Sequence, residues 1–216
     1  MPVRLQELHP SLVHFPIALL PAAVAADLLA RLTDSDALAE AGRVLMPVAA
    51  ASAVVSAAAG LVAQEEVRAE GVAHDLLATH RTLNVALTAI GTAMAAYRVG
   101  VRRPGARYLA VGLAGLGALG YSAYLGGKMV YEHGVGVKPA DGLRDGDSPE
   151  LAPGHFGEAA RRAVRDVETA IPTAVEEMRA GDLLPAIGRD LENPAALPPR
   201  DLGARDEGPG APESIP

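Results

Sequence analysis

The chain of 216 residues is half hydrophobic by residue type and carries a formal net charge of −7. It contains no cysteine, which excludes disulfides, thiolate metal sites and cysteine nucleophiles. The negative net charge, with no basic patch interleaved with aromatic residues, argues against a nucleic-acid partner.

The apolar residues gather in four runs, each close to the roughly 20 residues that cross a bilayer as a helix. The runs cover about 13–32, 44–63, 82–99 and 108–127, and the second and fourth contain no charge. We therefore predict that residues 1–138 form an all-α membrane domain, a four-helix transmembrane antiparallel bundle in contact with the lipid bilayer.

The first run has two features that bear on this prediction. It contains Asp27 four residues before Arg31, and at that spacing we expect the two side chains to pair near a helix end. A cleaved signal peptide is the alternative, since residues 23–27 read AVAAD. The segment before the run argues against cleavage, because Arg4 is offset by Glu7.

Residues 139–216 differ in composition and hold eleven of the 17 prolines. Within them, about 155–180 carry apolar residues at helical spacing, which predicts one amphipathic helix. The remainder of this C-terminal tail is expected to be disordered. A short amphipathic helix on such a tether suits the docking of another protein.

Charge in the connections predicts the orientation. Residues 98–107 contain four arginines and no acidic residue, whereas 64–81 contain four acidic residues against two arginines. By the positive-inside rule the arginine-rich connection is cytoplasmic. We therefore expect a multi-pass protein of the cell membrane with both termini outside.

All six histidines fall on the same side of a four-crossing topology. His14 and His80 each begin a ridge of small or polar residues at four-residue spacing, which is typical of surfaces where membrane helices meet. We expect both to face into the bundle near its outer surface, with His133 folding back over the same end. Pro10 disfavours a helical residue before it, so the helix should begin near residues 13–15 and leave His9 in an entry segment nearer solvent.

Two motifs flank these helices: HPSLVHFPIAL from His9 and GGKMVYEHGVGV from Gly126. They resemble the DUF2231 family of predicted bacterial membrane proteins, whose patterns are roughly HPxxVHFPIAL and GGxLVYxHGVGV; Met129 stands where leucine is usual. The resemblance covers about residues 8–138 and supports the membrane fold. Family members are sometimes fused to Rieske-type or cytochrome c domains, which implies a redox setting, although the family has no established activity.

The histidines suggest a cofactor. Two histidines from facing helices of a four-helix bundle can hold a haem b, and three around an open position would suit zinc or copper. The plain alternative is that the histidines only bond to carbonyls and stabilise the fold. The candidate residues are the ligands His14, His80 and His133, with His9 in support, the propionate partners Arg81 and Lys128, and the lining residues Tyr131, Phe15, Tyr121 and Tyr124.

Two functions remain open from the sequence. One is a redox membrane protein that passes electrons to an extracytoplasmic partner; the other is a non-catalytic subunit or scaffold of a membrane complex. No carboxylate pair, Ser/His/Asp order or phosphate loop indicates a hydrolase. Residues 115–120 read GLGALG and fit a dinucleotide fingerprint, but they lie inside an apolar run where no strand precedes them. We interpret these glycines as packing contacts.

Overall fold

The computed structural model describes residues 4–137, 154–180, 183–185 and 187. The described residues form six α-helices, which are α1 (Leu5–Leu12), α2 (His14–Thr33), α3 (Asp36–Glu66), α4 (Val72–Gly100), α5 (Ala106–His133) and α6 (Phe156–Arg179). The prediction of an all-helical protein is therefore confirmed for this part of the chain. The disorder predicted for the rest of the tail concerns residues outside it.

The first helix begins earlier than the prolines predict. α1 starts at Leu5 and contains both His9 and Pro10, so the expected start near residues 13–15 is wrong. Its first turn is closed by Glu7, whose carboxylate accepts the Arg4 N–H at 3.0 Å while its own N–H donates to the Arg4 carbonyl. The disfavour that a proline imposes on the preceding residue is a preference, and the bonded first turn outweighs it. α1 then runs almost directly into α2, since Val13 between them has helical φ and ψ.

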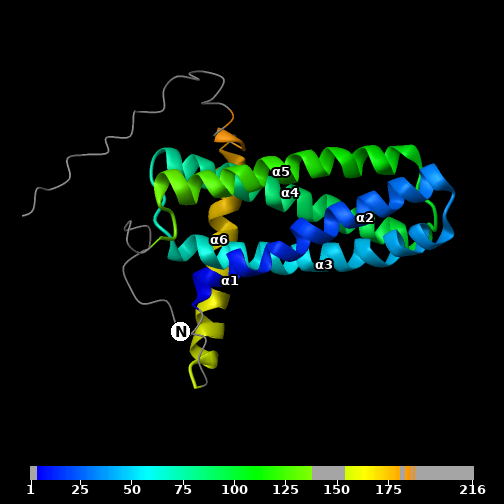
Figure 1. The fold of residues 1–216 in the computed structure, drawn as a ribbon. Coiled ribbons are helices and arrows are strands. Elements are labelled where there is room, and N and C mark those ends of the chain that lie inside the picture. Colours follow the sequence, from blue (N-terminus) through cyan, green and yellow to red (C-terminus); the bar gives the residue numbers. More distant parts are fainter. Residues whose placement is uncertain (1–3, 138–153, 181–182, 186, 188–216) are drawn as a thin grey trace, which may run out of the picture.

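The long helices α2, α3, α4 and α5 lie side by side along one axis, joined by connections of two to five residues (Figure 1). Each packs on the next along the chain, and α5 returns to α2, while α1 packs on α3. Small residues make the close approaches. Gly112 of α5 is one of them, because a Cβ at this position would meet Val24 at 3.1 Å. These contacts bring the start of α4 and the end of α5 to the end of the molecule where α1 lies.

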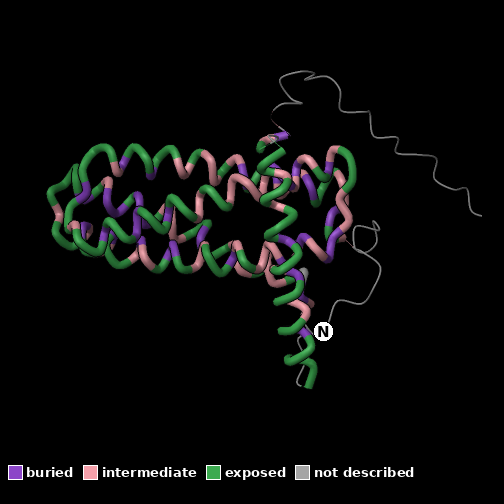
Figure 2. The backbone as a smooth tube through the Cα atoms, turned by 180° about the vertical axis from the view of Figure 1, so that it is seen from behind, coloured by how far each residue is buried: buried purple, intermediate pink, exposed green. Residues whose placement is uncertain are grey.

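The surface of this bundle is apolar. Figure 2 shows exposed residues along the outward side of every long helix, and among them are Phe15, Val54, Val111 and Leu113, each about half exposed or more. Within the described residues, three segments are long and apolar enough to cross a membrane, namely Glu7–Thr33, Asp36–Glu66 and Ala106–His133. Because such a surface would be a liability in water, it is read as the side that faces lipid.

α4 is the one long helix outside that set of three candidate spans. Its polar residues lower its mean hydropathy. They are concentrated toward its N-terminal half, where His74, Asp75, His80, Arg81 and Asn84 lie.

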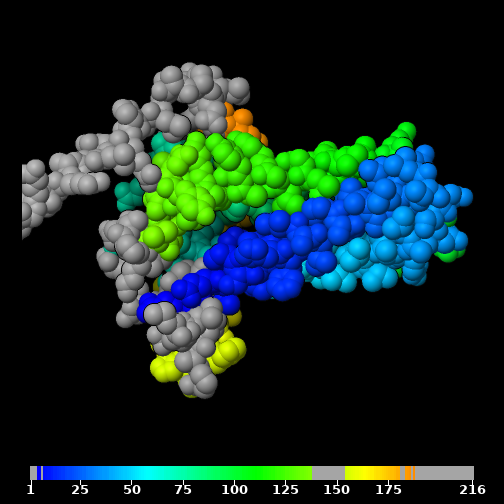
Figure 3. Space-filling model, in the orientation of Figure 1, coloured from blue at the N-terminus to red at the C-terminus, as the bar shows by residue number. Residues whose placement is uncertain are grey.

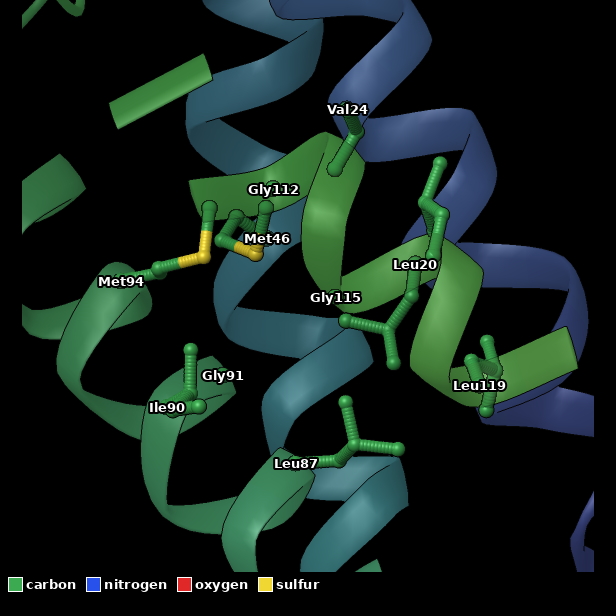
Figure 4. Close-up of a pocket in the computed structure, with 11 residues that line it drawn as sticks. Leu20, Val24, Met46, Leu87, Ile90, Gly91, Met94, Gly112, Gly115 and Leu119 are labelled. Atoms are coloured by element: carbon green, nitrogen blue, oxygen red, sulfur yellow. The ribbon is translucent and has the colours of Figure 1, made fainter. Parts of the chain in front are cut away.

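The centre of the bundle is packed by apolar side chains. Ala23, Val24, Met46, Ala50, Met94 and Ala95 form one buried cluster. Beside it lies a cavity of about 30 Å³ between Leu20, Met46, Leu87 and Leu119 (Figure 4). It is far smaller than the roughly 300–1,000 Å³ of a pocket for a drug-sized ligand, so the middle of the bundle is core rather than a binding site.

α6 lies across the long helices rather than along them, and its ends project beyond the bundle (Figures 1 and 3). It contacts α3, with Ala159 and Ala170 buried to 1% and 0% exposure. Arg162 pairs with Glu66 at 3.0 Å, and Glu177 pairs with Arg81 of α4. The amphipathic helix expected within 155–180 is thus docked on the bundle.

Candidate functional site

Two histidines from distant parts of the sequence meet at one end of the bundle. The ring centroids of His9 in α1 and His80 in α4 lie 6.2 Å apart, and the ring planes cross at 86°. Both residues are half-buried among the helix ends. This His9–His80 pair is the candidate site.

His9 is fixed by α3. Its Nδ1 lies 3.0 Å from the carbonyl oxygen of Ser56, and the Ser56 hydroxyl donates in return to the carbonyl of Leu12 at 3.0 Å. In a regular helix the N–H of residue 16 would take that carbonyl, but Pro16 has none. The serine thus fills the position that Pro16 leaves open, and the two bonds join the α1–α2 segment to α3.

His80 is fixed by α5 in a similar way. Its Nδ1 lies 2.9 Å from the carbonyl oxygen of Ser122. Asn84, one turn further along α4, donates to the Ser122 hydroxyl at 2.6 Å and to the His80 carbonyl at 2.7 Å. This small network explains why His80, Asn84 and Ser122 follow ridges of their helices that face the interior.

These bonds determine which ring nitrogen carries the proton. A carbonyl oxygen can only accept, so the Nδ1 of each ring donates and the neutral ring has its lone pair on Nε2. Histidines that bind metals are oriented in this way, with one nitrogen bonded to a carbonyl and the other toward the ligand. The pair therefore offers two oriented imidazole nitrogens.

Two glycines make room for the rings. A Cβ at Gly60 of α3 would lie 3.1 Å from atoms of the His9 ring, and one at Gly126 of α5 would lie 3.4 Å from the His80 ring. Each histidine therefore lies close against a backbone that carries no side chain at that point. Gly126 belongs to the GGKMVYEHGVGV motif, and a Cβ there would make an ordinary van der Waals contact with the ring, so the tighter fit is at Gly60.

The structure exchanges the expected roles of His9 and His14. His14 is exposed on α2, so its predicted inward position is wrong, and so is the solvent-side position predicted for His9. The physical reason is that one nearly continuous helix contains both residues. Five residues at about 100° each place them roughly 140° apart, so only one can face the bundle. His14 as a ligand stays a prediction, now without an inward-facing side chain to support it.

The other candidate residues lie around this end of the bundle with different partners. Arg81 pairs with Glu177 of α6, and Lys128 lies 3.9 Å from Glu132 one turn along α5. Tyr131 is 81% exposed, and Phe15 and Tyr124 are also exposed. The rings of Tyr121 and Tyr124 stack with centroids 6.3 Å apart.

His133 closes α5 at the same end. Its Nε2 is buried and has no hydrogen-bond partner among the described residues. The helix ends there because Gly134 adopts a left-handed conformation with φ of 66°, and its N–H returns to the Val130 carbonyl at 3.1 Å. Such an ending favours glycine, which accounts for the His-Gly step of the motif.

Sequence reasoning missed a buried ion pair at the opposite end of the bundle. Asp27 of α2 pairs with Arg98 of α4 at 2.8 Å, and both side chains have 0% exposure. The pairing expected between Asp27 and Arg31 is wrong. Arg98 also donates to the Ala39 carbonyl at 2.6 Å and to the Arg102 carbonyl at 2.7 Å. The sequence did contain a signal for this pair. Asp27 and Arg98 are isolated charges near the ends of two apolar runs, and the predicted topology places those ends on the same side of the membrane.

Comparison with known proteins places the chain in a family. Residues 6–139 match the family model described as a predicted membrane protein, DUF2231. The chain belongs to this family. The match covers the whole bundle and ends before α6, so the docked helix lies outside what the DUF2231 model describes. No curated protein and no solved structure matches the chain.

Proposed function

We propose that this DUF2231 protein binds a haem b between His9 and His80 and carries electrons at the membrane face where the pair lies. The observation that supports the proposal is the pair itself. Two neutral imidazoles from different helices are each oriented by a backbone carbonyl, which leaves both Nε2 atoms for a ligand.

The donor set favours haem over a bare metal ion. Haem supplies four nitrogens of its own and needs at most two protein ligands, whereas a structural zinc site needs about four. Among the described residues no group of three or more histidine, aspartate and glutamate side chains is arranged to hold a metal. Two imidazoles bound to one metal through bonds of about 2 Å stand roughly 6 Å apart, centre to centre. The observed centroid separation is 6.2 Å.

When bound, the group would supply reversible one-electron chemistry. His9 and His80 would hold the group, and Ser56, Ser122 and Asn84 would fix the two imidazoles. The apolar bundle on one side of the site keeps water from it. Since exposure and hydrogen bonding around axial ligands set a haem potential, the Ser56 and Ser122 carbonyls would tune it.

The membrane arrangement that goes with this proposal has four crossings, with α4 as the fourth. α4 has 29 residues and is packed between α3 and α5, two of the three candidate spans. The arginine-rich end of the bundle then faces the cytoplasm by the positive-inside rule, which puts the His9–His80 pair at the outer face. The partner would be an extracytoplasmic redox protein or membrane complex.

An absorption spectrum tests the cofactor. Full-length protein purified from haem-replete cells should show a Soret band and, on reduction, a sharp α band. His9→Ala or His80→Ala should each remove or strongly shift the bands, whereas His14→Ala, at an exposed position, should keep them. A colourless wild-type protein would contradict haem binding. A spectrum that survives in both variants would contradict the assigned ligands.

A scaffold is the second candidate, and the same hydrogen bonds favour it. His9 joins α1 to α3 and His80 joins α4 to α5 without any cofactor, so both histidines have a structural role on the geometry alone. In that case the protein is colourless, and both alanine variants lower its thermal stability while its metal content stays at background. Both candidates predict lower thermal stability for His9→Ala and His80→Ala, so the absorption spectrum and metal content of the wild-type protein separate them.

A further inference from the structure

α6 has three faces of different chemistry. Toward the bundle it presents Ala159, Asp166 and Ala170, all buried. A second face is charged and exposed, formed by Glu158, Arg161, Arg165, Glu168, Glu176 and Arg179. A third is an apolar stripe of Phe156, Val164, Ile171, Val175 and Met178, between 38% and 68% exposed. At about 100° per residue the three faces are centred roughly 110–140° apart, so the stripe faces neither the bundle nor the charged side of the helix.

The helix is held in this rotation by ion pairs. Arg162 forms an ion pair with Glu66, the last residue of α3, at 3.0 Å. Further along, Glu177 pairs with Arg81 and lies 3.5 Å from the His74 ring near the start of α4. The anchors fix both the place and the rotation of α6. The ion pairs therefore hold α6 in a rotation that leaves the stripe exposed.

The direction of α6 is the second observation. It crosses the long helices where α3 ends and α4 begins (Figures 1 and 2). Three of the bundle helices are long and apolar enough to span a membrane. A helix that crosses spanning helices near their ends lies along the membrane surface, where an amphipathic helix buries its apolar face about 5–10 Å into the headgroup and acyl boundary.

We propose that α6 is an interfacial helix whose apolar stripe inserts into the bilayer surface at the face of the His9–His80 pair. The occupant of the stripe is lipid, because α6 packs on α3, a candidate span whose outward side chains include the exposed Val54 and Val55. This assignment does not depend on a bound haem.

The binding is apolar rather than electrostatic. Residues 156–179 contain four arginines (161, 162, 165 and 179) against five carboxylates (158, 166, 168, 176 and 177), which leaves no excess positive charge. Attraction to anionic lipid requires basic residues in excess. A zwitterionic bilayer should therefore suffice, and added salt should have little effect.

The absence of cysteine makes a labelling test direct. Single-cysteine variants of the full chain are labelled with an environment-sensitive fluorophore and reconstituted in phosphatidylcholine vesicles. Val164→Cys and Ile171→Cys probe the stripe, while Arg165→Cys and Glu168→Cys are matched controls on the charged face. Val54→Cys, exposed in the middle of α3, is the deep lipid reference. Quenching is then compared between aqueous iodide and lipids that carry a nitroxide near the headgroup or deep in the chain.

The stripe labels should be blue-shifted, protected from iodide and quenched most by the shallow nitroxide, while the control labels are quenched mainly by iodide. Val54→Cys should respond most to the deep nitroxide. Iodide quenching of the stripe equal to that of the controls overturns the proposal. Protection from both iodide and nitroxide also overturns it, since the stripe then meets protein. A shift that appears only with anionic lipid overturns the apolar mechanism.

Discussion

Polar side chains join the helices at both ends of the bundle, but they do so with different chemistry. At one end His9 and His80 are neutral, and each uses one nitrogen on a backbone carbonyl. At the other end, Asp27 and Arg98 form an ion pair with no exposed side-chain surface. The Arg98 guanidinium also donates hydrogen bonds to a carbonyl of α3 and to one in the connection after α4. His80 and Arg98 are separated by eighteen residues of α4, about 27 Å. The charges of Asp27 and Arg98 are used within the fold, whereas each histidine uses only its Nδ1 in these bonds.

Breaking the ion pair should have the largest effect. Asp27→Ala leaves the Arg98 guanidinium buried without its carboxylate, and loss of one partner of a buried pair costs about 3–5 kcal/mol. Thermal unfolding in detergent measures it. The double variant Asp27→Ala, Arg98→Met removes both charges and should recover much of the loss. A double variant as unstable as the single one would mean that the carbonyl bonds of Arg98, not the charge balance, dominate.

Removing His80 should have a smaller effect. His80→Ala leaves the buried Ser122 carbonyl without its ring donor, which costs about 1–3 kcal/mol. His14→Ala serves as the control and should change stability by no more than about 0.5 kcal/mol, because its side chain is exposed. If His14→Ala is the more destabilising of the two, the orientation described for this pair of histidines is incorrect.

The sequence indicated the helices well and this pair of histidines poorly, for a physical reason. Long apolar runs define membrane helices because composition and length suffice for them. The choice between His9 and His14 depends on rotation about the helix axis, and rotation depends on where the helix starts. Pro10 suggested a late start, but the bonds between Arg4 and Glu7 start the helix before it. The pairing of Asp27 with Arg98 was hidden because it depends on which helix ends meet, which no local spacing reveals.

Ser56 allows a gentler test of the histidine end. Ser56→Ala removes the hydroxyl bond to the Leu12 carbonyl but keeps the carbonyl that holds His9. Interhelical hydrogen bonds in membranes average about 0.6 kcal/mol, so thermal stability should fall slightly while any haem spectrum is unchanged. Loss of the haem spectrum in Ser56→Ala would show that the bond from the Ser56 hydroxyl to the Leu12 carbonyl is needed to position His9.

The smallest expected effect concerns pH and α6. Burial, and then the nearby Glu66, raise the pKa of Asp166, while Arg162 opposes the shift. A carboxyl whose pKa is raised on docking contributes stability that is complete below its ordinary pKa of about 3.9. The contribution fades as pH rises through the raised value. The contribution of Asp166 is the difference between the wild-type protein and Asp166→Asn. Hydrogen exchange of α6, corrected for intrinsic rates, should be slower in the variant above the raised pKa and equal in the two proteins in acid. An unchanged profile in the variant would assign it to another group.

The distance between the two fixed ends also has a consequence for the membrane itself. With α4 fastened at His80 and at Arg98, it cannot slide against its neighbours to adjust its span. The rise of about 27 Å between those points lies near the 27–33 Å hydrocarbon thickness of biological bilayers, at the thin end of that range. In the four-crossing arrangement proposed above, a thicker bilayer would have to thin locally around the protein, and such mismatch would favour its retention in thinner membranes.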